Sequence, residues 1–248
     1  MQIKIWHLIA SFILVALIIF YAFLRLDEQR SLPPEQVYNP EIQKMIDAAR
    51  PSLVQFTAEG HLAAYGFVVD QEHGLAVTAR HFVASAANKG EVSKHIDGVM
   101  TQDGRKYEAR LVALRDDCDL ALIKINSSDI KALPVSKKDN PQAGAALLTV
   151  GNPAEKYRRL IVEGTLLQLN FRPPSPGCNP NESNDPVRCC ADIFFYKAAG
   201  TVNTLSGAPV LDMNGEVVGL HSATLAKDPA TGVMIKSLVI REMLRQQL

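Results

Sequence analysis

Three side chains spread along the sequence could together carry out nucleophilic catalysis. His81 follows an apolar run that ends in Thr78, Asp119 opens the apolar stretch 119–125, and Ser206 precedes a predicted hairpin. A serine hydroxyl is a weak nucleophile at neutral pH, but an imidazole can take its proton when a carboxylate holds the other ring nitrogen. Singly, each residue also has an ordinary interpretation, as a strand-end histidine, a turn aspartate and a loop serine. Together, in the order His, Asp, Ser, they favour a serine hydrolase.

The segments that carry these side chains are predicted to be short β-strands joined by tight turns. Asp103-Gly104 and Asn214-Gly215 each separate two apolar runs, which is a strong hairpin signal because both central residues of the favoured turn need a positive φ. Further strands are predicted at 52–57, 66–69, 75–78, 109–114, 120–125, 146–150 and 161–169. A short helix is expected at 41–50 and an amphipathic helix at the end of the chain. This pattern favours an all-β fold built from β-barrels.

The N-terminal residues predict a membrane anchor. Residues 5–24 contain no Asp, Glu, Lys or Arg, and as a helix rising about 1.5 Å per residue they would cross the roughly 30 Å hydrocarbon core. A cleaved signal peptide usually has a shorter apolar region and small residues at its cleavage site, whereas this run ends in Tyr21-Ala22-Phe23-Leu24. We therefore favour an uncleaved transmembrane signal anchor over a cleaved signal peptide.

The anchor and the strand pattern together predict the domain layout. A short tail at 1–4, the anchor at 5–24 and a linker at 25–40 lead into one large domain at 41–248, outside the cytoplasm. In that domain we expect one barrel at about 51–125, a second at about 143–240 and a C-terminal helix at about 237–248.

Composition and the positions of the cysteines exclude some classes of protein and indicate an oxidising compartment. The 26 basic and 26 acidic side chains cancel, so we expect no nucleic-acid partner, and the 47% of hydrophobic residues excludes a mainly disordered chain. Cys178, Cys189 and Cys190 crowd into one polar loop, which suits a disulfide in an oxidising compartment and matches no Cys-x2-Cys zinc pattern. Cys118, beside Asp119, is interpreted as a small buried apolar residue.

Several motifs together are typical of one family. They lie at 66–70, 103–109, 119–125, Gly151-Asn152-Pro153 and 206–219, with Ser206-Gly207-Ala208-Pro209 running ungapped into Asn214-Gly215. With these motifs the chain resembles, over about residues 50–245, the protease domain of the trypsin-like HtrA (Deg) serine peptidases. The resemblance implies a chymotrypsin/trypsin-like double β-barrel that needs no metal or organic cofactor. It implies that His81 is the general base, Asp119 the carboxylate that orients it and Ser206 the nucleophile.

One departure from the family concerns the oxyanion hole, which the resemblance assigns to the backbone N–H groups of Ser206 and Thr204. The family usually has Gly-Asn-Ser-Gly-Gly where this chain has Thr204-Leu205-Ser206-Gly207-Ala208. A β-branched threonine resists a positive φ at a cost of about 1–3 kcal/mol, and a misaimed donor would lower the rate by about 10²–10³. A second hypothesis therefore stays open, a weak or inactive protease-fold module that binds a partner or senses envelope state.

The resemblance also predicts a substrate pocket and partners. Thr201, Val202, Asn203, His221 and Ser222 should line a small to medium, uncharged pocket for modest apolar side chains, although an ordinary half-buried histidine is an equal interpretation of position 221. A bridge from Cys178 to Cys189 or Cys190 would pin a loop that regulates the active site in HtrA relatives, or would simply staple a surface loop.

For the whole chain we expect a membrane-tethered serine endopeptidase acting on protein or peptide substrates. It would cross the bacterial inner membrane once, with its C-terminal domain in the periplasm. We expect no PDZ domain of the kind that many relatives carry after the peptidase domain, and the resemblance raises the expectation of a trimer.

Overall fold

A computed structural model of the chain describes residues 38–58, 61–83, 96, 98–115, 117–151, 161–167, 190, 192–199, 205–225 and 227–248. The predicted anchor at 5–24 lies outside these residues. Among the helices that are described, none is long and apolar enough to cross a membrane.

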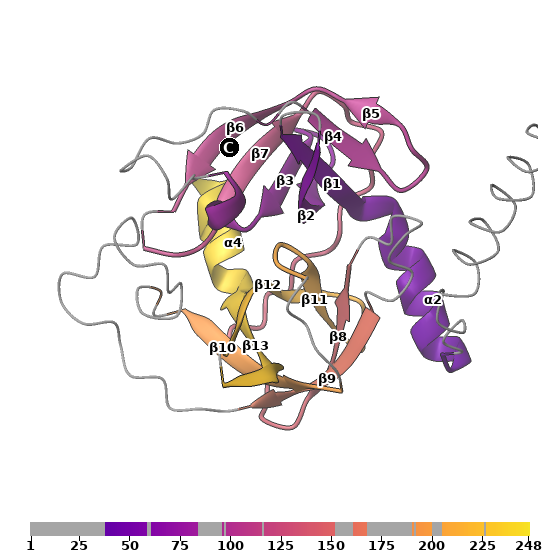
Figure 1. The fold of residues 1–248 in the computed structure, drawn as a ribbon, viewed down its shortest axis with the longest axis vertical. Helices are drawn as coiled ribbons and strands as arrows, with labels where there is room; N and C mark the ends of the chain where they lie inside the picture. The colour runs from indigo at the N-terminus through magenta and orange to yellow at the C-terminus, as the bar shows by residue number, and fades with distance from the viewer. Residues whose placement is uncertain are drawn as a thin grey trace, which may run out of the picture. The chain divides into compact units, whose positions relative to one another are not determined.

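The first half of the domain is a seven-stranded antiparallel sheet, in the upper part of Figure 1. Its strands are β1 (Leu53–Ala58), β2 (His61–Asp70), β3 (Leu75–Thr78), β4 (Gly98–Thr101), β5 (Lys106–Tyr107), β6 (Ala109–Leu114) and β7 (Ala121–Ile125). They pair in the order β5-β4-β1-β2-β3-β7-β6. Because β3 pairs antiparallel with β7, the end of β3 and the start of β7 lie side by side at the same end of the sheet.

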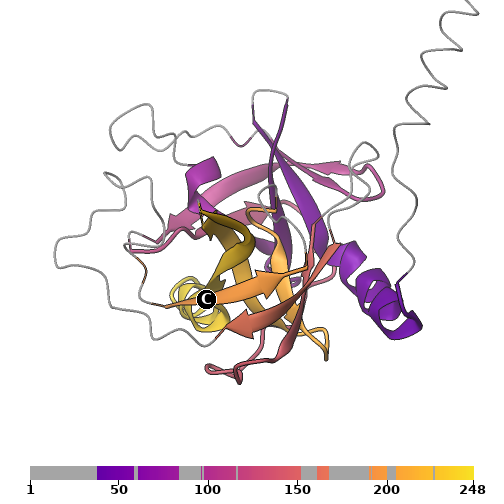
Figure 2. The same cartoon turned by 60° about the horizontal axis from the view of Figure 1, so that its bottom comes forward.

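The second half is a closed six-stranded barrel, drawn in salmon (β8 and β9) and in orange to yellow (β10 to β13) in Figure 2. Its strands are β8 (Ala146–Val150), β9 (Ile161–Leu167), β10 (Ile193–Ala198), β11 (Pro209–Asp212), β12 (Val217–Leu225) and β13 (Asp228–Lys236). They pair in the order β10-β13-β12-β11-β8-β9. Helix α2 (Pro40–Ala49), capped by the Asn39 side chain, precedes the first sheet, and helix α4 (Ser237–Arg245) follows the barrel.

The all-β double-barrel fold expected from the sequence is confirmed, and most predicted strands agree with the structure within a few residues. Two strands, β10 and β13, were not predicted. β13 contains Pro229 and Gly232, which are typical of turns rather than strand interiors. β10 begins with the β-prone run Ile193–Tyr196, a signal that could have identified it.

Alternating side chains divide the buried residues into separate clusters. Ala76 of β3 packs inside the first sheet, whereas its neighbours Leu75 and Val77 pack into a cluster that also holds Leu220 of β12 and Val239 of α4. This shared cluster joins the two halves of the domain through apolar contact. A third cluster fills the interior of the second barrel.

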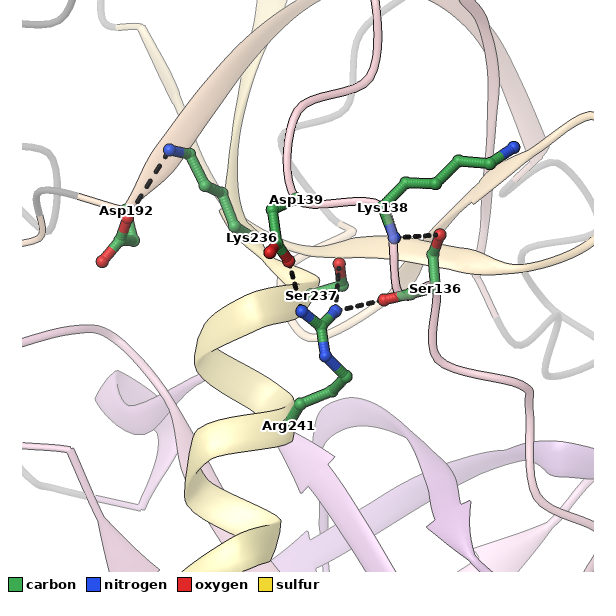
Figure 3. A network of polar contacts seen from close by, with 7 residues as sticks. All are labelled: Ser136, Lys138, Asp139, Asp192, Lys236, Ser237 and Arg241. Carbon is green, nitrogen blue, oxygen red and sulfur yellow. Dashed lines mark hydrogen bonds and ion pairs between the residues drawn. The ribbon is translucent and has the colours of Figure 1, made fainter.

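A polar network ties α4 to the segment that connects the two halves (Figure 3). The Arg241 guanidinium donates to the carbonyl oxygen of Ser136 and to the Asp139 carboxylate, and it lies 3.3 Å from Ser237 Oγ. The Ser136 hydroxyl accepts a 3.3 Å hydrogen bond from the Lys138 backbone N–H. One arginine thus fixes the final helix against the connecting segment.

A disulfide joins Cys118 and Cys190, which corrects two expectations from the sequence. Cys118 is buried as expected but is not a free apolar residue, and Cys190 cannot pair with Cys178. Both sulfurs lie in the shared apolar cluster, with the two Cα atoms 4.6 Å apart. The predicted partners Cys178 and Cys189 lie outside the described residues. The bond joins the loop between β6 and β7 to the residue that lies three positions before β10, a proximity that only the packing of the two halves creates.

Candidate active site

His81 and Asp119 meet where β3 ends and β7 begins. His81 lies in the short 3₁₀ helix Arg80–Phe82 that follows β3, and Asp119 lies two residues before β7. His81 Nδ1 is 2.8 Å from Asp119 Oδ2, and the His81 backbone N–H donates to Asp119 Oδ1 at 2.8 Å. Because a carboxylate only accepts hydrogen bonds, Nδ1 carries the proton and Nε2 is left as a base.

The two side chains differ in their exposure to solvent. The Asp119 side chain is 6% exposed, whereas that of His81 is 45% exposed. The His81 ring also packs against the Phe82 ring, with 4.2 Å between centroids. A buried carboxylate therefore orients an imidazole whose free edge can reach solvent or a substrate.

Ser222 of β12 supplies a further hydrogen bond to Asp119. Its hydroxyl donates to Asp119 Oδ2 at 2.6 Å, although the two residues are 103 positions apart. The sequence prediction placed Ser222 in the substrate pocket and missed this contact. No local pattern could have revealed it, because the contact depends on how the barrel packs against the first sheet.

Ser206 lies in the turn before β11, close to the same strand. Its hydroxyl donates to the backbone carbonyl oxygen of Ser222 at 2.9 Å. Among the described residues, no hydrogen bond joins Ser206 Oγ to the His81 ring. The structure therefore places Ser206, Ser222, Asp119 and His81 in one connected group, with the serine hydroxyl turned toward β12.

Gly207 shapes the turn that carries Ser206. Its φ is +88°, and a Cβ at this position would lie 2.1 Å from the Tyr65 carbonyl oxygen of β2. Its backbone N–H donates to the His221 carbonyl oxygen at 2.8 Å, and the His221 N–H donates to the Ala208 carbonyl oxygen at 2.9 Å. The turn that carries Ser206 is thus held between the first sheet and β12, in a conformation that glycine adopts without strain.

His221 is fully buried, unlike the half-buried histidine considered from the sequence. Its ring lies inside the second barrel, with Nδ1 2.9 Å from the Tyr196 hydroxyl. Burial raises the pKa of Tyr196 well above its ordinary value, so its hydroxyl stays protonated. The other predicted pocket residues, Thr201, Val202 and Asn203, lie outside the described residues, as does Thr204 of the predicted oxyanion hole.

The loop that carries Asp119 is braced by charged side chains. Arg115 binds both carboxylate oxygens of Asp117, at 2.7 and 2.8 Å, and Glu242 of α4 at 3.3 Å. These hydrogen bonds from Arg115 hold the pKa of Asp117 below its ordinary value. Within the described part of the chain, no group of three or more His, Cys, Asp or Glu side chains is arranged to hold a metal ion.

Known proteins are similar to this chain in sequence. Residues 64–220 match the family model described as "Trypsin-like peptidase domain". The chain is 27% identical over 164 residues to a "Probable serine protease do-like" of Buchnera aphidicola, covering 66% of this chain and 30% of the relative. It is 25% identical over 187 residues to the "Periplasmic serine endoprotease DegP" of Escherichia coli, covering 74% of this chain and 35% of the relative. The chain therefore spans about a third of the length of these relatives.

Solved structures share the fold. The inactive form of the Rv3671c protease matches with a TM-score of 0.63 and 21% identity, over 86% of this chain and 98% of that chain. An inactive serine-to-alanine variant of the same Mycobacterium tuberculosis H37Rv protein also matches with a TM-score of 0.63, at 20% identity, over 87% of this chain and 96% of that chain.

Proposed function

The chain belongs to the trypsin-like peptidase family, and from that premise we propose that it is a serine endopeptidase acting on protein or peptide substrates. The observation that carries the proposal is the group around Asp119. This buried carboxylate binds the backbone and ring of His81 and the hydroxyl of Ser222, whose carbonyl oxygen in turn binds Ser206. An oriented, solvent-exposed imidazole that is linked to a serine through Asp119 and Ser222 supports a mechanism of peptide-bond hydrolysis through an acyl-enzyme.

In the proposed mechanism, His81 Nε2 takes the proton of Ser206 Oγ as that oxygen attacks the scissile carbonyl. The imidazolium formed is stabilised by Asp119 and then protonates the leaving amine. Water, activated by the same imidazole, hydrolyses the ester and restores Ser206. The backbone N–H groups of Ser206 and Thr204 would stabilise the oxyanion. No step requires a metal or an organic cofactor.

The location that we propose is the bacterial envelope. The relatives DegP and its homologues are named as periplasmic, and the charge-free run at 5–24 is long enough for a membrane anchor. We therefore propose a single-pass inner-membrane protein whose peptidase domain faces the periplasm. Assembly into a homo-oligomer, a trimer by family resemblance, is part of the same proposal.

One observation favours a second candidate, an inactive module that binds a partner. The Ser206 hydroxyl is bonded to the Ser222 carbonyl oxygen rather than to His81. In unliganded enzymes, however, such catalytic hydrogen bonds often form only when substrate binds. We therefore place the peptidase first.

A fluorophosphonate probe separates these two candidates, because it reacts only with an activated serine. We expect the full-length chain to be labelled, the Ser206→Ala variant to remain unlabelled, and His81→Ala to lose most of the labelling. Circular dichroism of each variant provides the control for folding. A folded wild-type chain that takes up no label would support the inactive module instead.

A further inference from the structure

The loop between β6 and β7 carries Asp119 and is closed at its base by backbone hydrogen bonds. Leu114 pairs with Ala121 at the ends of the two strands, and the Arg115 backbone N–H donates to the Leu120 carbonyl oxygen at 3.0 Å. Antiparallel pairing therefore brings both ends of the loop together. It does not by itself fix the residues between them, so the position of the Asp119 carboxylate depends on further contacts of the loop.

The Arg115 side chain supplies such contacts. Its Nε and Nη2 donate to the two carboxylate oxygens of Asp117 at 2.7 and 2.8 Å, and its Nη1 lies 3.3 Å from Glu242 Oε2. The two-point contact with Asp117 orients the planar guanidinium, because its N–H groups match both oxygens of one carboxylate. The remaining terminal nitrogen then faces α4, so one side chain joins the loop of the first half to the helix that follows the barrel.

The burial of Arg115 distinguishes these contacts from an ordinary surface ion pair. Arg105 Nε also donates to a carboxylate two positions away, that of Asp103 at 2.7 Å, but these two side chains are 55% and 56% exposed. Exposed pairs of this kind contribute little to stability because solvent screens them. The Arg115 side chain is only 18% exposed, so it has lost much of its hydration and depends on its two carboxylate partners for compensation.

Two consecutive residues just before Asp119 are held in place. Asp117 is bound by Arg115, and Cys118 is joined to Cys190 by the disulfide. The Asp119 carboxylate then accepts three hydrogen bonds from two other segments, at 2.6–2.8 Å. Hydrogen bonds this short require that the backbone before the carboxylate be fixed, since a shift of about 1 Å would weaken all three.

We infer that Arg115 is a positioning residue for the proposed reaction and that Glu242 of α4 anchors it to the second half of the domain. The inference rests on the proposed peptidase function. Arg115 acts through Asp117 on the placement of Asp119, and so on the imidazole that this carboxylate orients, without contact to the reacting atoms. The helix that follows the barrel thereby takes part in placing the Asp119 carboxylate, and breaking its contact with Arg115 lowers the reactivity of Ser206.

The test measures how fast a fluorophosphonate probe labels Ser206 of the full-length chain over a range of probe concentrations. We expect Arg115→Ala to lower the rate at saturating probe by about tenfold to a hundredfold, because a displaced base takes the serine proton less efficiently. The probe concentration that gives half the maximal rate should stay unchanged. Arg105→Ala removes a similar pair at another turn and should label like the wild type. A merely structural role of Arg115 would reduce the fraction of the chain that is labelled and not this rate.

Two further variants separate the geometry of the contact from its charge. Arg115→Lys keeps the positive charge but cannot bind both oxygens of Asp117 as a guanidinium does, so it should restore only part of the lost rate. Glu242→Ala should slow labelling less than Arg115→Ala does. It should have almost no additional effect in the Arg115→Ala background, because both changes remove the same contact. Independent losses in the double variant would overturn the role of Glu242 as the anchor.

Hydrogen exchange provides a measurement that does not depend on an activated serine. The His81 backbone N–H donates to Asp119 Oδ1 at 2.8 Å, and the His73 backbone N–H donates to Asp70 Oδ1 at 2.9 Å in the turn between β2 and β3. In the full-length Arg115→Ala variant, exchange at the His81 amide should be about tenfold faster than in the wild type, while exchange at the His73 amide stays unchanged. A general loss of stability would accelerate exchange at both amides.

The two measurements separate this inference from the proposed function. Selective acceleration at the His81 amide supports the inference even if the wild-type chain takes up no probe, an outcome that would overturn only the proposed function. The inference is overturned if Arg115→Ala is labelled as fast as Arg105→Ala. It is also overturned if exchange at the His81 amide is unchanged or accelerates no more than exchange at the His73 amide.

Discussion

At the scale of single residues, Asp119 is the most restrained group in the candidate site. Two of its hydrogen bonds come from His81 and one comes from Ser222, so both halves of the domain hold the same carboxylate. We therefore expect Ser222 to act as a positioning residue, because its hydroxyl binds Asp119 and its carbonyl oxygen accepts a hydrogen bond from Ser206.

Replacing Ser222 with alanine should slow the labelling of Ser206 by about tenfold to a hundredfold, because Asp119 loses a charge-assisted hydrogen bond. The rate of fluorophosphonate labelling measures this loss. Ser237→Ala, a similarly buried serine that contacts Arg241, is the control and should label at the wild-type rate. Equal rates for the two variants would remove Ser222 from the proposed machinery.

Replacing Gly207 with alanine should lower the free energy of unfolding for two reasons, the positive φ and the clash of the new Cβ with the Tyr65 carbonyl oxygen. Gly207 has a φ of +88° and no room for a Cβ, whereas Gly215 has a φ of +79° and no atom within 4 Å of an added Cβ. Gly215→Ala should therefore cost about 1–2 kcal/mol, and Gly207→Ala about 1–3 kcal/mol more. Urea unfolding of both variants measures the difference, and equal midpoints would show that the turn relaxes away from Tyr65.

At the scale of secondary-structure elements, two side chains of the candidate site lie close together because they lie at adjacent ends of neighbouring strands. His81 follows β3 and Asp119 precedes β7, so antiparallel pairing of these two strands places an imidazole beside a carboxylate 38 residues away. Such pairing requires only short turns and alternating apolar residues, which sequence patterns describe well.

A contact between two elements also holds α4 in place, because Arg241 of this helix binds the segment that connects the two halves of the domain. Arg241→Ala should lower the free energy of unfolding by about 1–3 kcal/mol, because the buried carbonyl oxygen of Ser136 loses its arginine donor. Arg245→Ala, in the exposed last turn of the same helix, removes the same charge and should change stability by less than about 0.5 kcal/mol. Denaturant unfolding compares the two, and similar losses would indicate a general effect of helix charge.

At the scale of the whole domain, an apolar cluster and a disulfide join the two halves. The Cys118–Cys190 bond closes a loop of 72 residues next to Asp119, and both cysteines are buried. It therefore limits the freedom of the unfolded chain and supports the loop that carries the carboxylate.

Breaking this disulfide should lower the free energy of unfolding by about 2–5 kcal/mol. Because either substitution breaks the same bond, Cys118→Ala, Cys190→Ala and the double variant should lose similar amounts in urea unfolding under oxidising conditions. Additive losses in the double variant would mean that the two cysteines contribute separately and not through their bond.

The sequence by itself predicted those features that depend on residues close together in the chain. Alternating apolar residues and Asp-Gly or Asn-Gly turns predicted most strands and the double-barrel fold, and the order of His81, Asp119 and Ser206 indicated their chemistry. The catalytic roles of these three residues stay predictions. Only the tertiary structure decided the Cys118–Cys190 bond, the hydrogen bond from Ser222 to Asp119 and the contact between Tyr196 and His221. Each of these joins residues far apart in the chain, and their proximity is created by strand register and by the packing of one half against the other, which no local pattern encodes.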